Sequence, residues 1–290
     1  FDGDGKLFFT FNKRLENPSL KVTYPPDFDR QKIVAFSKTK DTALVFMRNM
    51  DFDSLRMVFF DNNNPIDTIY KKKGRKEAFS RFLTFQYNIN NEGKLKPGSD
   101  LSIKTTLPVE NIEQSLISLK EDSAEVSNFT IQKDTSDLRL FTLKYRWKQS
   151  ANYTLTINEG AFTDIYGDKN KRAPKRFQVD KPENYSVLNL TFTVPDTARS
   201  YVIELINDQK NVLRTDVIRK NTTLIYKNYI TGKYQVRVVY DDNKNGKWDS
   251  GNVKRKIQPE NIWVDETIIT LRPNWEQDVP ITIPKEPVNP

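Results

Sequence analysis

The stretch SVLNLTFTV, residues 186–194, alternates large apolar side chains with mostly polar ones. Leu188, Leu190, Phe192 and Val194 fall at every second position, so an extended chain places them on one face. This period of two is typical of a β-strand with one face buried in a core. The same alternation recurs far away along the chain, in KLFFTFN (6–12), NYTLTIN (152–158) and GKYQVRVVY (232–240). The sequence therefore predicts β structure throughout.

Turn signals separate these segments. Clusters rich in Asn, Asp, Gly and Pro interrupt the chain at DNNNP (61–65), NNEGKLKPG (90–98) and YGDKNKRAP (166–174). These residue types favour turns, because they tolerate or fix backbone angles that other residues avoid. Helical periodicity is scarce, and its best example is the short VENIEQSLISL (109–119). Many short strands with frequent turns are typical of β-sandwiches.

Two polar seams divide the chain, one near residues 90–100 and one near 179–186. A β-sandwich domain takes about 100 residues, so a chain of 290 residues has room for three. We predict an all-β fold of three tandem β-sandwiches, over residues 1–95, 96–180 and 181–290.

The composition limits the chemistry that the chain can perform. It has no His and no Cys, which excludes zinc sites built on those residues, Cys nucleophiles and Ser-His dyads. Glycoside hydrolysis by two carboxylates remains open in principle. The spaced pairs Asp27 with Asp29 and Asp51 with Asp53 lie in turn-rich segments, where solvated loop acids are expected. We therefore predict a protein that is not an enzyme and has no catalytic residues.

The chain is basic, with a formal net charge of +8. Three clusters carry much of this charge: Lys71, Lys72, Lys73, Arg75 and Lys76; Lys169, Lys171, Arg172, Lys175 and Arg176; and Lys254, Arg255 and Lys256. Such patches can attract nucleic acid, lipopolysaccharide or anionic glycans. We favour solvated loops and edge-strand lysines that discourage sheet pairing as their explanation, and no nucleic-acid-binding motif accompanies them. We predict no nucleic-acid partner.

No uncharged apolar run reaches the roughly 18 residues that a membrane helix requires. The chain begins at Phe1, without a Met or a signal-like segment. We read this as a mature or trimmed chain whose targeting information lay upstream.

Several segments resemble a known family. They are NYTLTINEGAFTDIYGD (152–168) within residues 97–179, YITGKYQVRVVYDDNKNGKWDSGN (229–252), KRKIQPENIWV (254–264) and the opening FDGDGKLFFTFNKRLENPSLKV (1–22). The first resembles a bacterial Ig-like domain of the SbsA type. The next two resemble the C-terminal part of Ig-like domain-containing lipoproteins of Bacteroidota, and the opening resembles the Ig-like unit that precedes it.

The resemblance implies two Ig-like sandwiches followed by a transthyretin-like, or prealbumin-like, sandwich. It also implies export and attachment to the outer membrane, on its periplasmic or outer side, through a lipid anchor upstream of this chain. The family has no established activity.

The stretch YDDNKNGKWDSGN (240–252) is spaced like a calcium loop. The predicted ligands are the side chains of Asp241, Asn243, Asn245 and Asp249 and the carbonyl of Lys247. The glycine falls at the sixth position, as in such loops, but the twelfth position is Asn252 rather than a bidentate Glu. Weak Ca²⁺ binding is therefore one interpretation. The other is an ion-free hairpin turn at Asn245-Gly246 whose amides are capped by neighbouring Asp side chains.

The tryptophans suggest packing more than ligand binding. We expect Trp147 in the core, Trp248 against the end of a sandwich, and Trp263 and Trp275 near strand ends with their rings covered. Asp164 is expected to bind backbone amides of its own loop.

The function predicted from the sequence is a non-catalytic cell-envelope lipoprotein. It would act as a structural spacer or as an accessory subunit of an outer-membrane protein assembly. A glycan-binding or adhesive surface module is the alternative. No cofactor is expected beyond the weak Ca²⁺.

Overall fold

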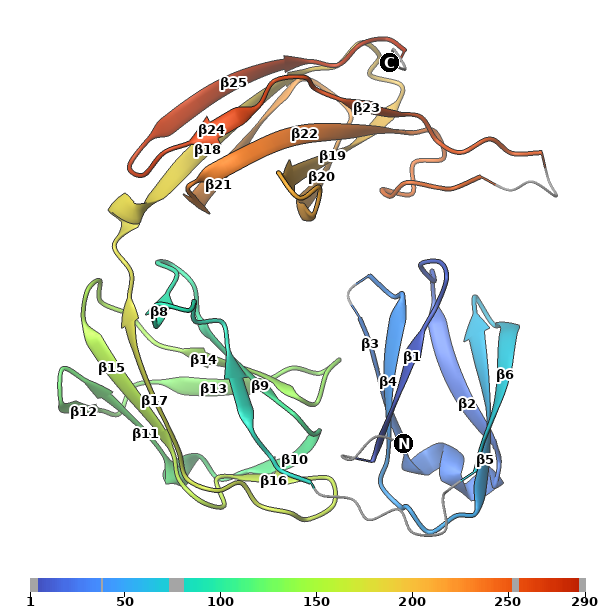
Figure 1. Ribbon diagram of the computed structural model, residues 1–290, viewed down its shortest axis with the longest axis vertical. Helices are drawn as coiled ribbons and strands as arrows, with labels where there is room; N and C mark the ends of the chain where they lie inside the picture. Colours follow the sequence, from blue (N-terminus) through green and yellow to red (C-terminus); the bar gives the residue numbers. More distant parts are fainter. Residues whose placement is uncertain (1–4, 38, 73–80, 252–255, 287–290) are drawn as a thin grey trace. The chain divides into compact units, whose positions relative to one another are not determined.

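The computed structural model describes residues 5–37, 39–72, 81–251 and 256–286. It divides into two compact units, residues 1–179 and 180–290. Its regular elements are strands and three 3-10 helices, and none of these helices is long and apolar enough to cross a membrane. The predicted all-β fold of tandem β-sandwiches is confirmed (Figure 1).

The first sandwich pairs two three-stranded sheets. One has the order β1 (Lys6–Thr10), β4 (Thr42–Met47), β3 (Lys32–Phe36), and the other has the order β2 (Pro18–Tyr24), β5 (Ser54–Asp61), β6 (Asn64–Lys72). The 3-10 helix η1 (Pro26–Gln31) joins the two sheets. Alternate residues of both sheets, such as Val45 and Met57, meet in one apolar core.

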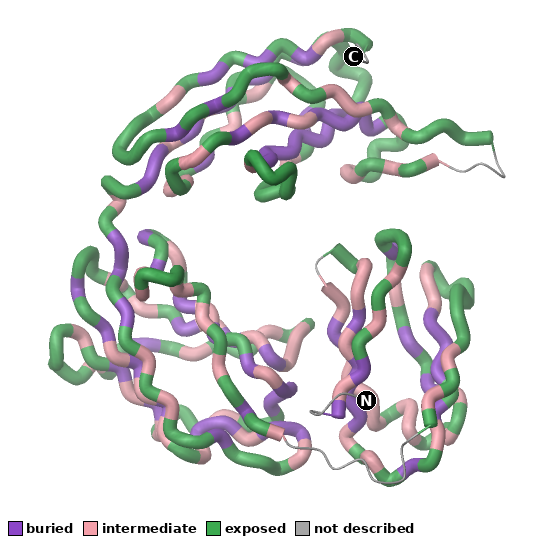
Figure 2. The backbone as a smooth tube through the Cα atoms, in the orientation of Figure 1, coloured by how far each residue is buried: buried purple, intermediate pink, exposed green. Residues whose placement is uncertain are grey.

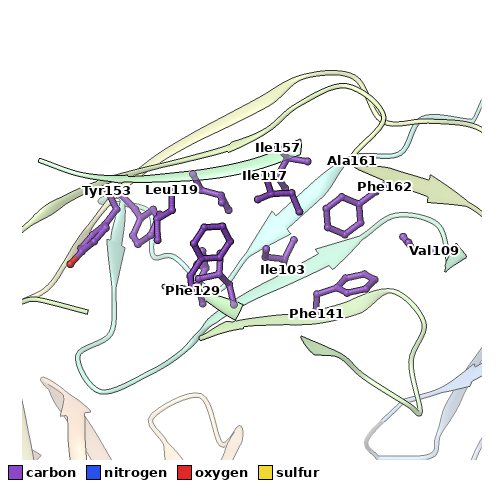
Figure 3. Close-up of a cluster of buried hydrophobic side chains, with 14 of the residues drawn as sticks. Ile103, Val109, Ile117, Leu119, Phe129, Phe141, Tyr153, Ile157, Ala161 and Phe162 are labelled. Atoms are coloured by element: carbon purple, nitrogen blue, oxygen red, sulfur yellow. The ribbon is translucent and has the colours of Figure 1, made fainter. Parts of the chain in front are cut away.

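The second sandwich supplies the larger core of the first unit. One sheet has five strands in the order β12 (Ala124–Val126), β11 (Ile117–Glu121), β15 (Asn152–Ile157), β17 (Ala173–Val179), β8 (Lys94–Leu95). The other has four strands in the order β13 (Thr130–Lys133), β14 (Leu140–Lys144), β9 (Leu101–Thr105), β7 (Phe85–Tyr87). A two-stranded sheet, β10 (Val109–Ile112) with β16 (Phe162–Asp164), and helix η2 (Gln114–Leu116) complete it. Figure 3 shows the side chains that fill this core.

The strands of residues 85–95 belong to the second sandwich. The sequence-based division assigned them to the first sandwich, but β7 pairs with β9 and β8 pairs with β17, both strands of the second. The two sandwiches also share a core, since Phe46 of β4 is fully buried in the cluster that holds Phe162. The first unit is therefore continuous across the first predicted boundary.

The second unit is a single sandwich. One sheet has the order β21 (Thr222–Ile230), β18 (Tyr185–Thr193), β25 (Glu276–Thr282). The other has the order β20 (Val212–Ile218), β19 (Ser200–Asn207), β22 (Gly232–Asp241), β23 (Ile262–Val264), and β24 (Ile269–Leu271) also pairs with β22. Helix η3 (Pro182–Asn184) leads into β18. The pairing of β25 with β18 is parallel.

The predicted strand faces are buried as expected. Leu188, Leu190 and Phe192 of β18 and Val236 and Val238 of β22 are fully buried in one cluster. Buried and exposed residues alternate along many strands (Figure 2). The assignment of individual sandwiches to Ig-like or transthyretin-like types stays a prediction.

Candidate functional site

The loop after β22 is organised by the side chain of Asp241, the last residue of that strand. Asp241 is 1% exposed. Its Oδ1 accepts a hydrogen bond from the amide of Asn245 at 2.9 Å, and its Oδ2 accepts one from the amide of Gly246 at 3.0 Å. Lys244 and Gly246 have positive φ angles of 61° and 76°, and these turn the chain back toward the carboxylate. A buried carboxylate therefore fixes the start of the loop.

Hydrogen bonds join the other predicted ligands. The Nδ2 groups of Asn243 and Asn245 both donate to Oδ2 of Asp249. Oδ1 of Asn245 accepts the amide of Lys247 at 3.0 Å. The structure thus brings the five predicted residues together, Lys247 through its backbone. Asn252 lies outside the described residues.

Glu260 is a further carboxylate at this loop, and the motif spacing did not predict it. Its Oε1 accepts the amide of Asp242 and its Oε2 accepts the amide of Asp249, both at 3.0 Å. Burial raises the pKa of Glu260, backbone hydrogen bonds lower it, and the nearby carboxylates of Asp249 and Asp241 raise it again. Negative charge is therefore concentrated at this loop.

Oxygen ligands of this kind suit Ca²⁺, but these oxygens are already engaged by N–H groups. Over residues 5–37, 39–72, 81–251 and 256–286, no group of three or more acidic side chains is arranged to hold a metal ion. The loop is also not a tight hairpin, because the next strand begins only at Ile262. Cation binding stays a prediction.

The tryptophans differ in how far they are covered. Trp147 packs against the large core of the first unit and Trp263 against the core of the second, as expected. Trp248 is 45% exposed, and its indole N–H donates to a backbone carbonyl at 3.0 Å. Trp275 is 51% exposed, with an arginine guanidinium 4.9 Å from its ring centroid. The expected covering is thus only partial for the last two.

Asp164 binds its own loop, as the sequence predicted. Its Oδ1 accepts the amides of Tyr166 at 2.8 Å and Asp168 at 3.0 Å. Burial raises the pKa of Asp164, although these two hydrogen bonds oppose the rise. The carboxylate holds the turn that leads from β16 toward β17.

Asn170 fixes the far side of the same loop. It is 1% exposed. Its Oδ1 accepts the amide of Phe162 at 2.7 Å, and its Nδ2 donates to the carbonyls of Asn158 and Lys171, both at 2.8 Å. The basic residues on either side of Asn170 are therefore carried by an ordered backbone.

These basic residues line a depression between β7 and the start of β17, which we call the basic groove. It consists of two hollows of about 460 and 410 Å³ that share Leu83, Thr84 and Lys171. The first hollow is also lined by Arg81, Phe82, Asp168 and Lys169, and the second by Phe85, Tyr87, Arg172, Ala173, Pro174 and Lys175.

The strands explain why the groove is open. β7 is the edge strand of its sheet. β17 pairs with β8 only at Gln178 and Val179, so the opening residues of β17 also form an edge. Pro174 lies in this part, where β17 pairs with β15 on its other side, at Thr156, and proline is tolerated in edge strands of this kind.

Aromatic rings form part of the groove. The ring of Phe82 is 61% exposed, whereas Phe85 packs edge-on against buried Phe162 with centroids 5.2 Å apart. The ammonium of Lys175 lies 5.8 Å from the centroid of Tyr87. Burial raises the pKa of Tyr87 to about 12, so this hydroxyl stays protonated at neutral pH. Phe82 is the most open ring of the groove.

The sequence did not predict the groove. The sequence favours a solvated loop for the cluster around Lys171 and leaves an anionic ligand as the alternative. It gives no sign of a groove, since residues 81–87 precede the cluster by more than eighty positions. The two segments lie in different sheets of the second sandwich and come together only when those sheets pack.

Comparisons with known proteins identify no family: no family model and no curated protein matches the chain. Three solved structures show distant similarity. The first is SGBP-B of the Bacteroides ovatus mixed-linkage glucan utilization locus in complex with a mixed-linkage heptasaccharide, with a TM-score of 0.28 and 11% identity over 78% of this chain and 65% of that one. The second is the I9-I11 tandem from titin, with a TM-score of 0.21 and 8% identity over 97% of this chain and 94% of that one. The third is the T6 backbone pilin of serotype M6 Streptococcus pyogenes, with a TM-score of 0.20 and 11% identity over 86% of this chain and 83% of that one. This chain spans less than two thirds of the SGBP-B structure. At this level of similarity, function has to be inferred from the chain's own residues.

Proposed function

We propose that the protein is a non-catalytic surface module of the cell envelope that binds a glycan in the basic groove. The observation that carries the proposal is the open ring of Phe82 in a hollow that also holds hydroxyl, carboxylate and ammonium groups. Concave sites with an aromatic surface and a few polar groups are typical ligand sites. A sugar offers an apolar C–H face to a ring and hydroxyls to the polar groups.

The cellular location in this proposal comes from the resemblance to Bacteroidota lipoproteins with SbsA-type Ig-like domains. It suggests export and attachment to the outer membrane through an upstream lipid anchor. Tandem β-sandwiches fit this interpretation, because they hold a binding face away from the attachment point.

Affinity electrophoresis tests the proposal. The purified chain is run through native gels that contain soluble polysaccharides, with Phe82→Ala as the variant and exposed Phe8→Ala as the control. Retardation of the wild type and of the Phe8 variant, lost in the Phe82 variant, supports glycan binding at the groove. Equal mobility with and without every polysaccharide refutes it.

A second function, as an accessory subunit of a protein assembly, is favoured by one edge strand. β20 is the edge of its sheet and exposes Val212, Leu213 and Val217. Apolar edges of this kind can accept a strand from a partner. A defined envelope complex that forms with the wild type and dissociates with Leu213→Lys would support this function. A complex that the variant leaves intact would exclude this edge.

A further inference from the structure

The basic groove carries far more positive than negative charge. Its lining holds five cationic side chains and one carboxylate, Asp168. Lys169, Lys171 and Arg172 are exposed. Within the described part of the chain, these three and Lys175 form no ion pair with an acidic side chain.

The like charges that line the groove repel one another. The loop cannot spread to relieve the repulsion, because Asp164 and Asn170 bind its backbone on both sides. Low-dielectric walls focus the field of such charges into a concave site. An anionic ligand would offset the repulsion, and a neutral one would not.

The remaining lining distinguishes among anions. A strand of nucleic acid binds by stacking successive bases on several open rings. Here Phe82 is open, while Phe85 packs on Phe162 and Tyr87 lies beside the Lys175 ammonium. Asp168 would also repel a densely charged polyphosphate. A carboxylate and a hydroxyl among cations instead suit a chain that has both hydroxyl groups and widely spaced negative charges.

We propose that the ligand of the basic groove is an acidic polysaccharide. Its carboxylate or sulfate groups pair with Lys169 and Lys171, and one sugar ring stacks on Phe82. Asp168 and Thr84 accept hydrogen bonds from sugar hydroxyls. This inference rests on the proposed glycan binding and adds the charge class of the ligand.

The central comparison of the test uses two probes that share a backbone and differ in charge. Oligogalacturonate and its fully methyl-esterified form have the same backbone, and only the first is anionic. Chondroitin sulfate, a neutral β-glucan and single-stranded DNA complete the set. Binding of the full chain is measured by titration calorimetry at two salt concentrations. The variant is Lys169→Gln with Lys171→Gln, and the control with the same loss of charge is Lys227→Gln with Lys233→Gln, two exposed lysines of the second unit.

We expect an acidic saccharide to bind at least 10-fold more tightly than both neutral ones. We expect the groove variant to lose about 2- to 30-fold in affinity for it, which is the range for two exposed ion pairs. The control variant should match the wild type, and added salt should weaken binding.

Each other outcome has a distinct meaning. Binding of neutral and acidic saccharides with equal affinity overturns the charge inference but leaves glycan binding intact. Absence of binding to all four saccharides overturns both. DNA bound as tightly as the acidic saccharides, with the same loss in the groove variant, shows a general polyanion site and overturns the inference. Equal losses in the groove and control variants place binding elsewhere and also overturn it.

Discussion

Replacing Asp241 with Ala should destabilise the second unit strongly. The change removes the acceptors of the Asn245 and Gly246 amides, at 2.9 and 3.0 Å, from a buried position. Hydrogen bonds to a charged group contribute about 1.5–3 kcal/mol each. Asn245 keeps a second acceptor, Oδ1 of Asn243 at 3.0 Å, so its share is smaller. We expect a loss of about 2–4 kcal/mol, or about 8–16 °C in the melting temperature of a unit of this size.

The measurement can be confined to the second unit. Three of the four tryptophans lie in it, and the fourth is Trp147. In a Trp147→Phe background, tryptophan fluorescence during urea or thermal unfolding reports on the second unit alone. Asp241→Asn is the matched variant, because it keeps one acceptor oxygen and should lose about half as much stability.

A loss below 0.5 kcal/mol for the Ala variant, the usual limit for surface substitutions, would refute this account of the loop. The same melts in Ca²⁺ and in chelator test the cation. A stabilisation by Ca²⁺ that Asp241→Ala abolishes would establish a site, and identical curves would remove it.

Three further changes concern the first unit. Phe162→Ala should cost about 3–5 kcal/mol in urea unfolding, because this fully buried ring packs edge-on against two others; a loss under 1 kcal/mol would contradict that packing. Asn170→Ala removes three hydrogen bonds of a buried side chain and should cost about 2–4 kcal/mol; Asn170→Asp, which keeps the acceptor, is the comparison, and no loss in either would show that the loop does not depend on this amide. The pKa of Glu121 lies below its ordinary value, chiefly through the hydrogen bond from Lys148, with two tyrosine hydroxyls adding to the effect. A lowered folded pKa gives stability that is present above pH 4.5 and lost as the pH falls further, so the stability difference between the wild type and Glu121→Gln should shrink from pH 7 to pH 3; a constant difference would contradict this.

The strand faces were predictable because their cause is local. A period of two places Leu188 and Phe192 on one side whatever the partner strand is, and burial of that side follows. The same holds for Asp164, whose hydrogen bonds reach only two and four residues ahead.

Features that depend on distant pairing were not predictable in the same way. Residues 109–119 have apolar residues at helix-like intervals, yet they form two strands and one 3-10 turn, because β10 and β11 pair with β16 and β15. Glu260 reaches the loop of Asp241 from eleven residues beyond Asp249, outside any calcium-loop spacing. The basic groove likewise depends on two segments that come together only in the finished sheets.

The parallel pairing of β25 with β18 has a consequence for how the chain matures. These partners are separated by 89 residues at Asn189 and Asp278. Synthesis from the N-terminus therefore leaves one side of β18 without its neighbour until the ribosome has released residue 282. During that delay the bare backbone can pair with a strand of another nascent chain. In the folded unit β25 covers this backbone, so that side of β18 is closed only when the C-terminal strand has been made.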